Sequence, residues 1–244
     1  MNNLYIVSTP IGNLQDITIR GVMVLNDVDY ILTEDVGKTN LLLSEINKRF
    51  GQLAESRKKP KIIQFNEYIE NERIHESIKL LEQGYDLALV SEAGTPLISD
   101  PGFKLIRYAL SHNIKLTAVP GASAVTASLV CSGLPTDKLL FIGFLPKTEV
   151  KKEKYFTNLK KTLEFMKVNN LNPTVVFFES PHRITETFEV FKRVFGDIKI
   201  CISRELTKIH EENICGLVSG FIEKYKSSSP KGEFTLLFNL KSDF

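Results

Sequence analysis

The feature of this sequence that most restricts its fold is the repeated alternation of short, uninterrupted apolar runs with segments of helical periodicity. In the first half the apolar runs lie at residues 4–7, 30–32, 62–63, 87–90 and 115–119, and helical patterns lie between them at about 19–25, 41–50, 70–83 and 103–111. A strand that is apolar throughout is covered on both faces, as in parallel sheets whose crossovers are helices. The first half therefore predicts a mainly parallel α/β domain.

The pattern changes near Pro120, where a helical segment at 122–131 leads into a second series of apolar runs. These runs lie at 139–144, 174–178, 199–203 and 234–240, with helical patterns between them at about 150–168, 182–194 and 218–225. The 244 residues are enough for two compact domains. We therefore predict two α/β domains in tandem, residues 1–120 and residues 121–244.

Composition excludes several classes of protein. Apolar residues make up 43% and charged residues 25%, which is ordinary for a folded globular chain. The first residues do not resemble a signal peptide, and no apolar stretch approaches the roughly 18 residues of a membrane helix, so we expect a cytoplasmic protein. The net charge is only +2, so any affinity for nucleic acid must come from local basic patches.

The cysteines and histidines argue against a metal site. Cys131, Cys201 and Cys215 are widely spaced, no CxxC pair occurs, and no HExxH is present. We therefore expect neither a bound metal nor a disulfide framework, and interpret the cysteines as buried apolar thiols.

Three loops of small residues follow apolar strands: residues 8–14, 91–102 and 120–124. In open α/β sheets, ligands bind at the carboxyl ends of the strands, where backbone N–H groups are accessible. Turn formation alone explains any one of these loops equally well, but three together favour a binding site. The absence of GxGxxG and of GxxxxGK[ST] argues against a dinucleotide or nucleoside triphosphate ligand.

Seven short motifs carry a family resemblance along essentially the whole chain, in the right order: PIGNL with DIT and Arg20, AGTPLISDPG, SGLPTD, GFLP, ESPHR, SRELTK and KGEF. Together they resemble the ribosomal RNA small subunit methyltransferase I family, a branch of the tetrapyrrole methylase superfamily. The sequence departs from the family pattern at residues 36–38, at 66–72 and at Glu92, where we expect RNA contacts to be affected more than cofactor contacts.

The resemblance implies a fold, a reaction and an assembly. The fold would be two α/β domains, with a mainly parallel sheet in the first, a mixed sheet in the second and S-adenosylmethionine in the cleft between them. The reaction would be 2′-O-methylation of a cytidine ribose in the decoding region of small-subunit (16S) ribosomal RNA. The partners would be this RNA or the assembled 30S subunit, and the protein would be a homodimer.

The resemblance also assigns residues. Cofactor contacts would come from Pro10, Ala93, Gly94, Thr95, Ile98, Ser123, Ala124, Glu179 and Glu205. Catalytic roles around the ribose would fall to Glu179, Arg183, Arg204 and Glu205.

Other interpretations of these polar residues remain open. A ribose hydroxyl needs a base or an orienting acceptor, for which Glu179, His182, Glu205 and His210 are candidates. His182 could equally lie in a first helical turn, and Arg204 with Glu205 could form a structural ion pair. Glu34 and Asp35 could reach the ligand site or cap a helix, and Asp100 could bind only backbone amides.

Lysine clusters are the candidate RNA-binding surfaces. Residues 147–161 hold six lysines against two glutamates, and residues 57–61 form a second basic patch. Such clusters bind phosphates without regard to sequence, although a solvated helix face is the alternative.

Three rival functions are less well supported by the motifs. A carbon methyltransferase acting on a corrin or porphyrin precursor would share the fold, but the ESPHR and SRELTK motifs favour the RNA-modifying branch. A module that binds S-adenosylmethionine or RNA without catalysis is disfavoured by the complete set of loops. A nucleotide-dependent dehydrogenase lacks its glycine motif.

Overall fold

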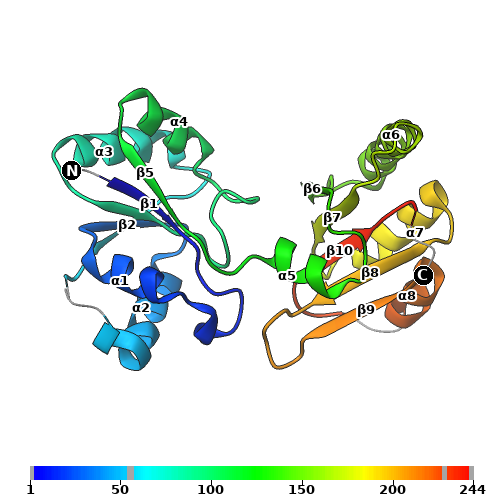
Figure 1. Ribbon diagram of the computed structural model, residues 1–244, viewed down its shortest axis with the longest axis horizontal. Coiled ribbons are helices and arrows are strands. Elements are labelled where there is room, and N and C mark those ends of the chain that lie inside the picture. Colours follow the sequence, from blue (N-terminus) through cyan, green and yellow to red (C-terminus); the bar gives the residue numbers. More distant parts are fainter. Residues whose placement is uncertain (1–2, 54–57, 227–229, 242–244) are drawn as a thin grey trace. The chain divides into compact units, whose positions relative to one another are not determined.

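The computed structural model describes residues 3–53, 58–226 and 230–241. Its chain divides into two compact units at the bond between Ser123 and Ala124, and each unit holds its own sheet. Both units are drawn in Figure 1.

Unit 1 is built on a parallel five-stranded sheet with the order β3-β2-β4-β1-β5. Its strands are β1 (Asn3–Val7), β2 (Tyr30–Thr33), β3 (Lys61–Gln64), β4 (Leu87–Leu89) and β5 (Lys115–Val119). Its helices are α1 (Ile19–Asp27), α2 (Val36–Phe50), α3 (Glu70–Glu82) and α4 (Phe103–Ser111), with 3₁₀ turns at Leu14–Asp16 and Gly51–Leu53. The predicted parallel sheet is confirmed.

The two faces of this sheet are covered by different helices, as Figure 1 shows. Leu4, Leu32 and Leu89 pack against α3 and α4, whereas Val7 and Ile31 pack against α1 and α2. Because neighbouring residues of a strand point to opposite faces, an uninterrupted apolar strand is what a sheet covered on both sides requires.

Unit 2 contains a mixed five-stranded sheet with the order β6-β7-β10-β8-β9. Its strands are β6 (Leu139–Phe144), β7 (Thr174–Glu179), β8 (Lys199–Arg204), β9 (Glu212–Leu217) and β10 (Phe234–Phe238). Its helices are α5 (Ala124–Cys131), α6 (Glu149–Val168), α7 (Ile184–Phe195) and α8 (Val218–Lys226). β6 and β7 are parallel, and β10 is antiparallel to both β7 and β8, so the predicted mixed sheet is confirmed.

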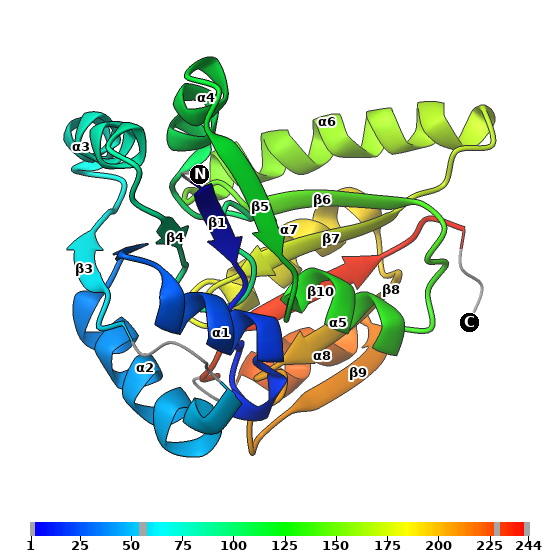
Figure 2. The same cartoon turned by 60° about the vertical axis from the view of Figure 1, so that its left-hand side comes forward.

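Helices cover the second sheet unequally. Val175 and Phe177 of β7 face the large aromatic core formed with α6, α7 and α8, whereas Val176 faces α5 on the other side. Figure 2 shows α5 lying across the front of this sheet, with α6, α7 and α8 behind it.

Three local features of the structure were not evident from the sequence. Strand β9 was not predicted, because its side chains alternate between partly buried and exposed along an edge of the sheet and do not form an apolar run. The first helix is capped by the Thr18 side chain, which accepts a hydrogen bond from the Gly21 amide, and Asp16 lies in the preceding 3₁₀ turn. The segment at 57–61 is described only from Lys58, whose ammonium pairs with Asp29 at 3.2 Å; Arg57 lies outside the described residues.

The interpretation of the cysteines as buried apolar thiols is wrong. Cys201 on β8 lies directly opposite Cys215 on β9, with a Cα–Cα distance of 4.0 Å, and the two form a disulfide. Cys131, at the end of α5, is a free thiol and is exposed. The spacing of 14 residues gave no sign of the pairing, because the hairpin that brings the two cysteines together depends on the unpredicted strand β9.

None of the helices in the described part of the chain combines the length and the apolar character needed to cross a lipid bilayer.

Candidate functional site

The three small-residue loops of unit 1 meet at the carboxyl edge of the parallel sheet. The chain leaves β1 toward β2 on one side and leaves β4 toward β5 on the other, so the neighbours β1 and β4 flank the point where the winding of the sheet reverses. At such a switch point the loops diverge and leave room for a ligand. The loops after β1, β4 and β5 are called here the β1 loop (8–14), the β4 loop (90–102) and the β5 loop (120–123).

Backbone and hydroxyl hydrogen bonds join these loops. The amide of Thr9 donates to the carbonyl of Gly94 at 2.9 Å, and the amide of Gly94 donates back to Thr9 at 3.1 Å. The Thr95 hydroxyl donates to the Ala122 carbonyl at 3.1 Å, so its one proton is used there. The Ser8 hydroxyl, 3.0 Å from Thr95 Oγ1, must therefore be the donor to Thr95.

Two glycines are required where these loops approach one another. Gly94 has φ +83°, and a Cβ built on it would lie 3.1 Å from Ile11 Cγ2 and 3.6 Å from the Ala122 carbonyl oxygen. A Cβ on Gly121 would lie 3.0 Å from Ser8 Cβ. The edge is thus a cradle of backbone groups in which added side-chain atoms would force the loops apart.

The β4 loop is held in an unusual backbone conformation. Leu97 and Ser99 both have positive φ values, of 74° and 75°, in addition to Gly94 and Gly102. Non-glycine residues adopt this region at a cost of the order of 1–3 kcal/mol each, and such residues cluster at ligand sites. Ile98, between them, is 40% exposed.

The remaining residues assigned to the cofactor in unit 1 lie in or beside the same loops. Pro10 is buried in the β1 loop, Ala93 is exposed at the tip of the β4 loop, and Ser123 is half-buried at the end of the β5 loop. Ala124 is the first residue of α5. The structure therefore brings Pro10, the assigned residues of the β4 loop and Ser123 together on three joined loops. Their role in cofactor binding stays a prediction.

Three carboxylates gather at the same edge of unit 1. Glu34 follows β2, and Glu92 and Asp100 belong to the β4 loop; the Lys38 ammonium is ion-paired with Glu92. Burial, together with the negative charges of Asp100 and Glu92, raises the pKa of Glu34 to about 7. Burial also raises the pKa of Asp100 to about 6, against a hydrogen bond from Ser91 that lowers it.

The capping interpretation of the Glu34-Asp35 pair is confirmed for Asp35, and contact of Glu34 with a ligand stays a prediction. Asp35 caps α2 by accepting a hydrogen bond from the Lys38 amide at 2.9 Å. Glu34 instead belongs to the carboxylate group at the sheet edge.

Unit 2 places its four proposed catalytic residues at one edge of its own sheet. Phe234 of β10 pairs with Glu179 at the end of β7 and with Arg204 at the end of β8. Glu205 follows Arg204, and Arg183 lies at the beginning of α7. His182 and His210 are exposed in turns next to this edge.

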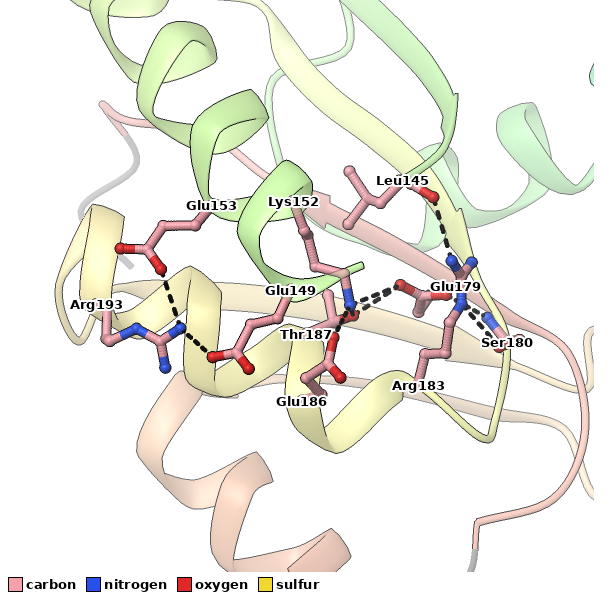
Figure 3. Close-up of polar contacts among 10 residues, drawn as sticks. All are labelled: Leu145, Glu149, Lys152, Glu153, Glu179, Ser180, Arg183, Glu186, Thr187 and Arg193. Carbon is pink, nitrogen blue, oxygen red and sulfur yellow. Dashed lines mark hydrogen bonds and ion pairs between the residues drawn. The ribbon is translucent and has the colours of Figure 1, made fainter. Parts of the chain in front are cut away.

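Glu179 is the centre of a buried ionic network, shown in Figure 3. Its Oε1 accepts hydrogen bonds from the Ser180 amide at 2.7 Å and pairs with Arg183 Nη2 at 2.6 Å. Its Oε2 accepts from the Thr187 hydroxyl at 2.7 Å and lies 3.9 Å from Lys152 Nζ. The Glu179 side chain has no exposed surface, and the four partners named above all belong to unit 2.

Lys152 is the other buried member of this network, and its place corrects the expectation that the whole run at 147–161 faces RNA. Its ammonium has no exposed surface and donates to Glu186 and to Thr187, each at 2.8 Å. Lys160 also points inward, donating to the Val194 carbonyl at 2.8 Å. Lys152 and Lys160 lie on the face of α6 that packs on α7, whereas Lys147, Lys151, Lys154 and Lys161 are exposed. The run of lysines in the sequence does not distinguish the two groups.

Arg183 is held by the same network. Its Nη1 donates to the Leu145 carbonyl and its Nε to the Ser180 hydroxyl, both at 3.2 Å. The guanidinium thereby ties the end of β6 to the end of β7 and remains 22% exposed.

Arg204 and Glu205 pair with different residues. The alternative prediction, a structural ion pair between the two, is therefore wrong. Arg204 Nε pairs with Glu212 at 3.1 Å. Glu205 accepts from Lys208 Nζ at 3.0 Å and from the Glu233 amide at 3.1 Å. Burial opposes the ionisation of Glu205, but these hydrogen bonds and the nearby positive charges outweigh it and hold its pKa below the usual value.

The backbone at this end of β8 is also strained. Glu205 and Thr207 have positive φ values of 51° and 64°. A Cβ on Gly232 would lie only 2.5 Å from Glu205 Cγ, so the KGEF motif needs glycine there to admit the Glu205 side chain.

The family model for tetrapyrrole (corrin/porphyrin) methylases matches residues 3–219. The chain is 39% identical to the ribosomal RNA small subunit methyltransferase I of Thermotoga maritima, over 99% of this chain and 100% of that protein. It is 40% identical to the protein of the same name from Rickettsia prowazekii, over 98% of this chain and 78% of that one.

Solved structures with the same fold are more distant in sequence. A cobalt precorrin-4 methyltransferase of cobalamin biosynthesis superposes with a TM-score of 0.66 at 15% identity, covering 96% of this chain and 93% of that one. A uroporphyrin-III-C-methyltransferase from Thermus thermophilus superposes with a TM-score of 0.60 at 16% identity, covering 97% and 94%.

We predict that Lys152→Met lowers the free energy of unfolding by about 3–5 kcal/mol, because it leaves the buried Glu179 and Thr187 without their cationic partner. Lys154→Met, on the exposed face of the same helix, is the matched control and is expected to change stability by less than about 0.5 kcal/mol. Urea denaturation of both variants measures the difference. Equal midpoints would show that the network does not stabilise the fold.

We also predict that Glu34 makes stability depend on pH. A carboxyl group with a raised pKa binds its proton more tightly in the folded state, so its contribution is complete below the unfolded pKa and is lost as the pH rises through the folded one. For Glu34 this window runs from 4.5 to about 7. Glu34→Gln is expected to flatten the decline of the thermal midpoint across that window, whereas the exposed Glu82→Gln leaves it as in the wild type. An unchanged slope for Glu34→Gln would contradict the assignment.

Proposed function

This chain belongs to the tetrapyrrole methylase family, and from that premise we propose that it is a methyltransferase of small-subunit ribosomal RNA that uses S-adenosylmethionine. The finer proposal is 2′-O-methylation of a cytidine in the decoding region. The proposal of ribosomal RNA methylation rests on 39–40% identity, over nearly the whole chain, with relatives named ribosomal RNA small subunit methyltransferase I. The cytidine and its 2′-hydroxyl are what the family resemblance of the motifs adds. The distant structures of corrin and porphyrin enzymes support the fold alone.

The loops of unit 1 fit a cofactor of this kind. We propose that the β4 loop, through Ala93, Gly94, Thr95 and Ile98, binds it together with Pro10, Ser123 and Ala124. The support is the cradle that Gly94 and Gly121 keep free of side-chain atoms. The hydrogen bonds that join the three loops fix this cradle before any ligand arrives, so little ordering entropy is lost on binding.

The charge at this edge suits a cationic ligand. Glu34, Glu92 and Asp100 crowd together. Burial raises the pKa of Glu34 and of Asp100, and repulsion from neighbouring carboxylates raises both further. A positive ligand placed among them would favour their ionised forms. S-adenosylmethionine, when bound, supplies an electrophilic methyl group carried on a positively charged sulfonium.

We propose different roles for the four polar residues of unit 2. Glu179 orients Arg183, because both of its oxygens are engaged by protein groups. Arg183 and Arg204 retain partly exposed guanidinium groups that can bind a phosphate or an ionised oxygen. Glu205 stays ionised at neutral pH, so it can accept the hydrogen bond of a ribose hydroxyl and orient it.

We propose that RNA binding is shared with exposed lysines of α6 and of the segment just before it: Lys151, Lys154 and Lys161 on the helix, and Lys147 two residues before its start. These side chains are exposed, and ammonium groups clustered in this way release counterions from phosphates. As in the family, the protein would act in the cytoplasm as a homodimer on this RNA or on the 30S subunit.

Gly94→Ala tests the cofactor site. We expect it to weaken S-adenosylmethionine binding at least tenfold, because the added methyl group would push against Ile11 and separate the β1 and β4 loops. Gly84→Ala is the matched control: Gly84 has a similar φ of +94°, but nothing lies within 4 Å of a Cβ there. Titration calorimetry measures both, and similar affinities for both variants would remove Gly94 from the site.

Mapping of 2′-O-methyl groups tests the function as a whole. Small-subunit RNA from cells lacking the protein is expected to lose one cytidine 2′-O-methyl group, which purified protein and S-adenosylmethionine restore.

Arg204→Ala and Glu205→Gln are expected to lower the single-turnover rate more than they weaken cofactor binding. Methyl transfer to a porphyrin or corrin precursor instead of RNA would support the rival carbon methyltransferase.

A further inference from the structure

The outer side of α4 combines exposed aromatic rings with positive charges. Phe103, Lys104, Arg107, Tyr108 and Ser111 are called here the α4 surface. Phe103 is 66% exposed and Tyr108 42% exposed, although both are large apolar side chains on a helix that already buries Leu105 and Ala109 against the sheet. Figure 2 shows α4 beside α3, and Lys104 and Tyr108 lie on the side of α4 that meets α3.

Part of this surface is hollowed. A cavity of about 290 Å³ is lined by Lys104, Arg107, Tyr108 and Ser111, which follow one another at helical spacing along one side of α4. Lysine and arginine offer only hydrogen-bond donors, and the tyrosine ring offers an apolar wall. The volume is close to the lower limit of small-molecule sites, about 300–1,000 Å³.

The rings are arranged as platforms. The Arg107 guanidinium lies over the Phe103 ring, 5.7 Å from its centroid. The Tyr108 ring stacks on His112 at 6.3 Å and meets the edge of His75 at 5.8 Å. Aromatic rings and arginine planes held in this way are the groups on which unpaired bases stack.

The α4 surface is fixed directly behind the β4 loop. Glu70 accepts the Gly102 amide on one oxygen at 3.1 Å and pairs with Lys104 on the other at 3.2 Å. Lys104 also donates to Asn71 at 3.0 Å. These contacts anchor the first turn of α4 to α3, and the β4 loop proposed to bind the cofactor leads straight into that turn.

We propose that the α4 surface binds a single-stranded segment of the RNA substrate, with a base against Phe103 and Tyr108 and a phosphate against Lys104 and Arg107. This rests on the proposed function and extends it by assigning a second RNA contact besides the α6 lysines. Charge complementarity favours RNA, because the exposed Arg107 guanidinium lies beside the rings and an apolar partner surface would leave its charge without compensation. The Lys104 charge is already balanced by Glu70.

The experiment compares Phe103→Ala and Arg107→Ala with two controls at exposed positions of α2: Leu41→Ala, which removes an apolar side chain that is 65% exposed, and Arg49→Ala, which removes an exposed guanidinium. Fluorescence anisotropy with a short oligoadenylate gives the affinity at several salt concentrations. Phe103→Ala should weaken binding about fivefold or more through lost stacking. Arg107→Ala should also reduce the salt slope by about 0.7. The controls should change neither.

Two further measurements separate the outcomes. S-adenosylmethionine binding should be unchanged in all four variants, and 30S methylation should fall for the α4 variants through a higher KM with a retained kcat. Wild-type RNA affinity and KM in the α4 variants would overturn the proposal while leaving the proposed function intact. A change only in the mass measured by light scattering would assign the surface to a second copy of the chain and would also overturn it. Absence of any methylation by the wild type would instead reject the proposed function.

Discussion

The pair of backbone hydrogen bonds between Thr9 and Gly94 is the interaction on which the candidate site of unit 1 depends. Each residue donates its amide to the carbonyl of the other, so the β1 and β4 loops are locked where the winding of the sheet reverses. The hydroxyls of Ser8 and Thr95 extend this link to the β5 loop. Because the bonds use backbone groups, they hold the loops in place while leaving the surface open to a ligand, provided that residue 94 has no side chain.

The edge of unit 2 is organised by a different force. There a carboxylate and an ammonium, Glu179 and Lys152, are removed from solvent and connected through Thr187. A buried charge is tolerated only when its hydrogen-bonding capacity is satisfied. The position of each side chain in the network is therefore set by its neighbour, and the last of these contacts joins Arg183 to the Leu145 carbonyl. The result is a guanidinium whose position is set from within the protein and whose remaining surface can meet an anion.

The two edges differ in charge as well. At the edge of unit 1, burial and the negative charge of neighbouring carboxylates raise the pKa of Glu34 and of Asp100, which favours a cationic ligand. At the edge of unit 2 each carboxylate has a basic partner: Glu205 has Lys208, and Glu212 has Arg204. The carboxylates of unit 1 thus repel one another, whereas these two carboxylates of unit 2 are balanced by basic side chains.

The sequence alone determined the class of fold, because a strand that is apolar throughout has no stable place outside a sheet covered on both faces. It also located the small-residue loops, since glycine and proline after a strand restrict the backbone locally. The partner of each charged side chain was decided only by the tertiary structure. Lys152 and Lys154 are two residues apart in one lysine-rich run, yet one is buried in an ionic network and the other is exposed. Cys201 and Cys215 became neighbours only through an edge strand without an apolar run. Such pairings join residues distant in sequence, so no local pattern records them, and the packing of helices and strands selects them.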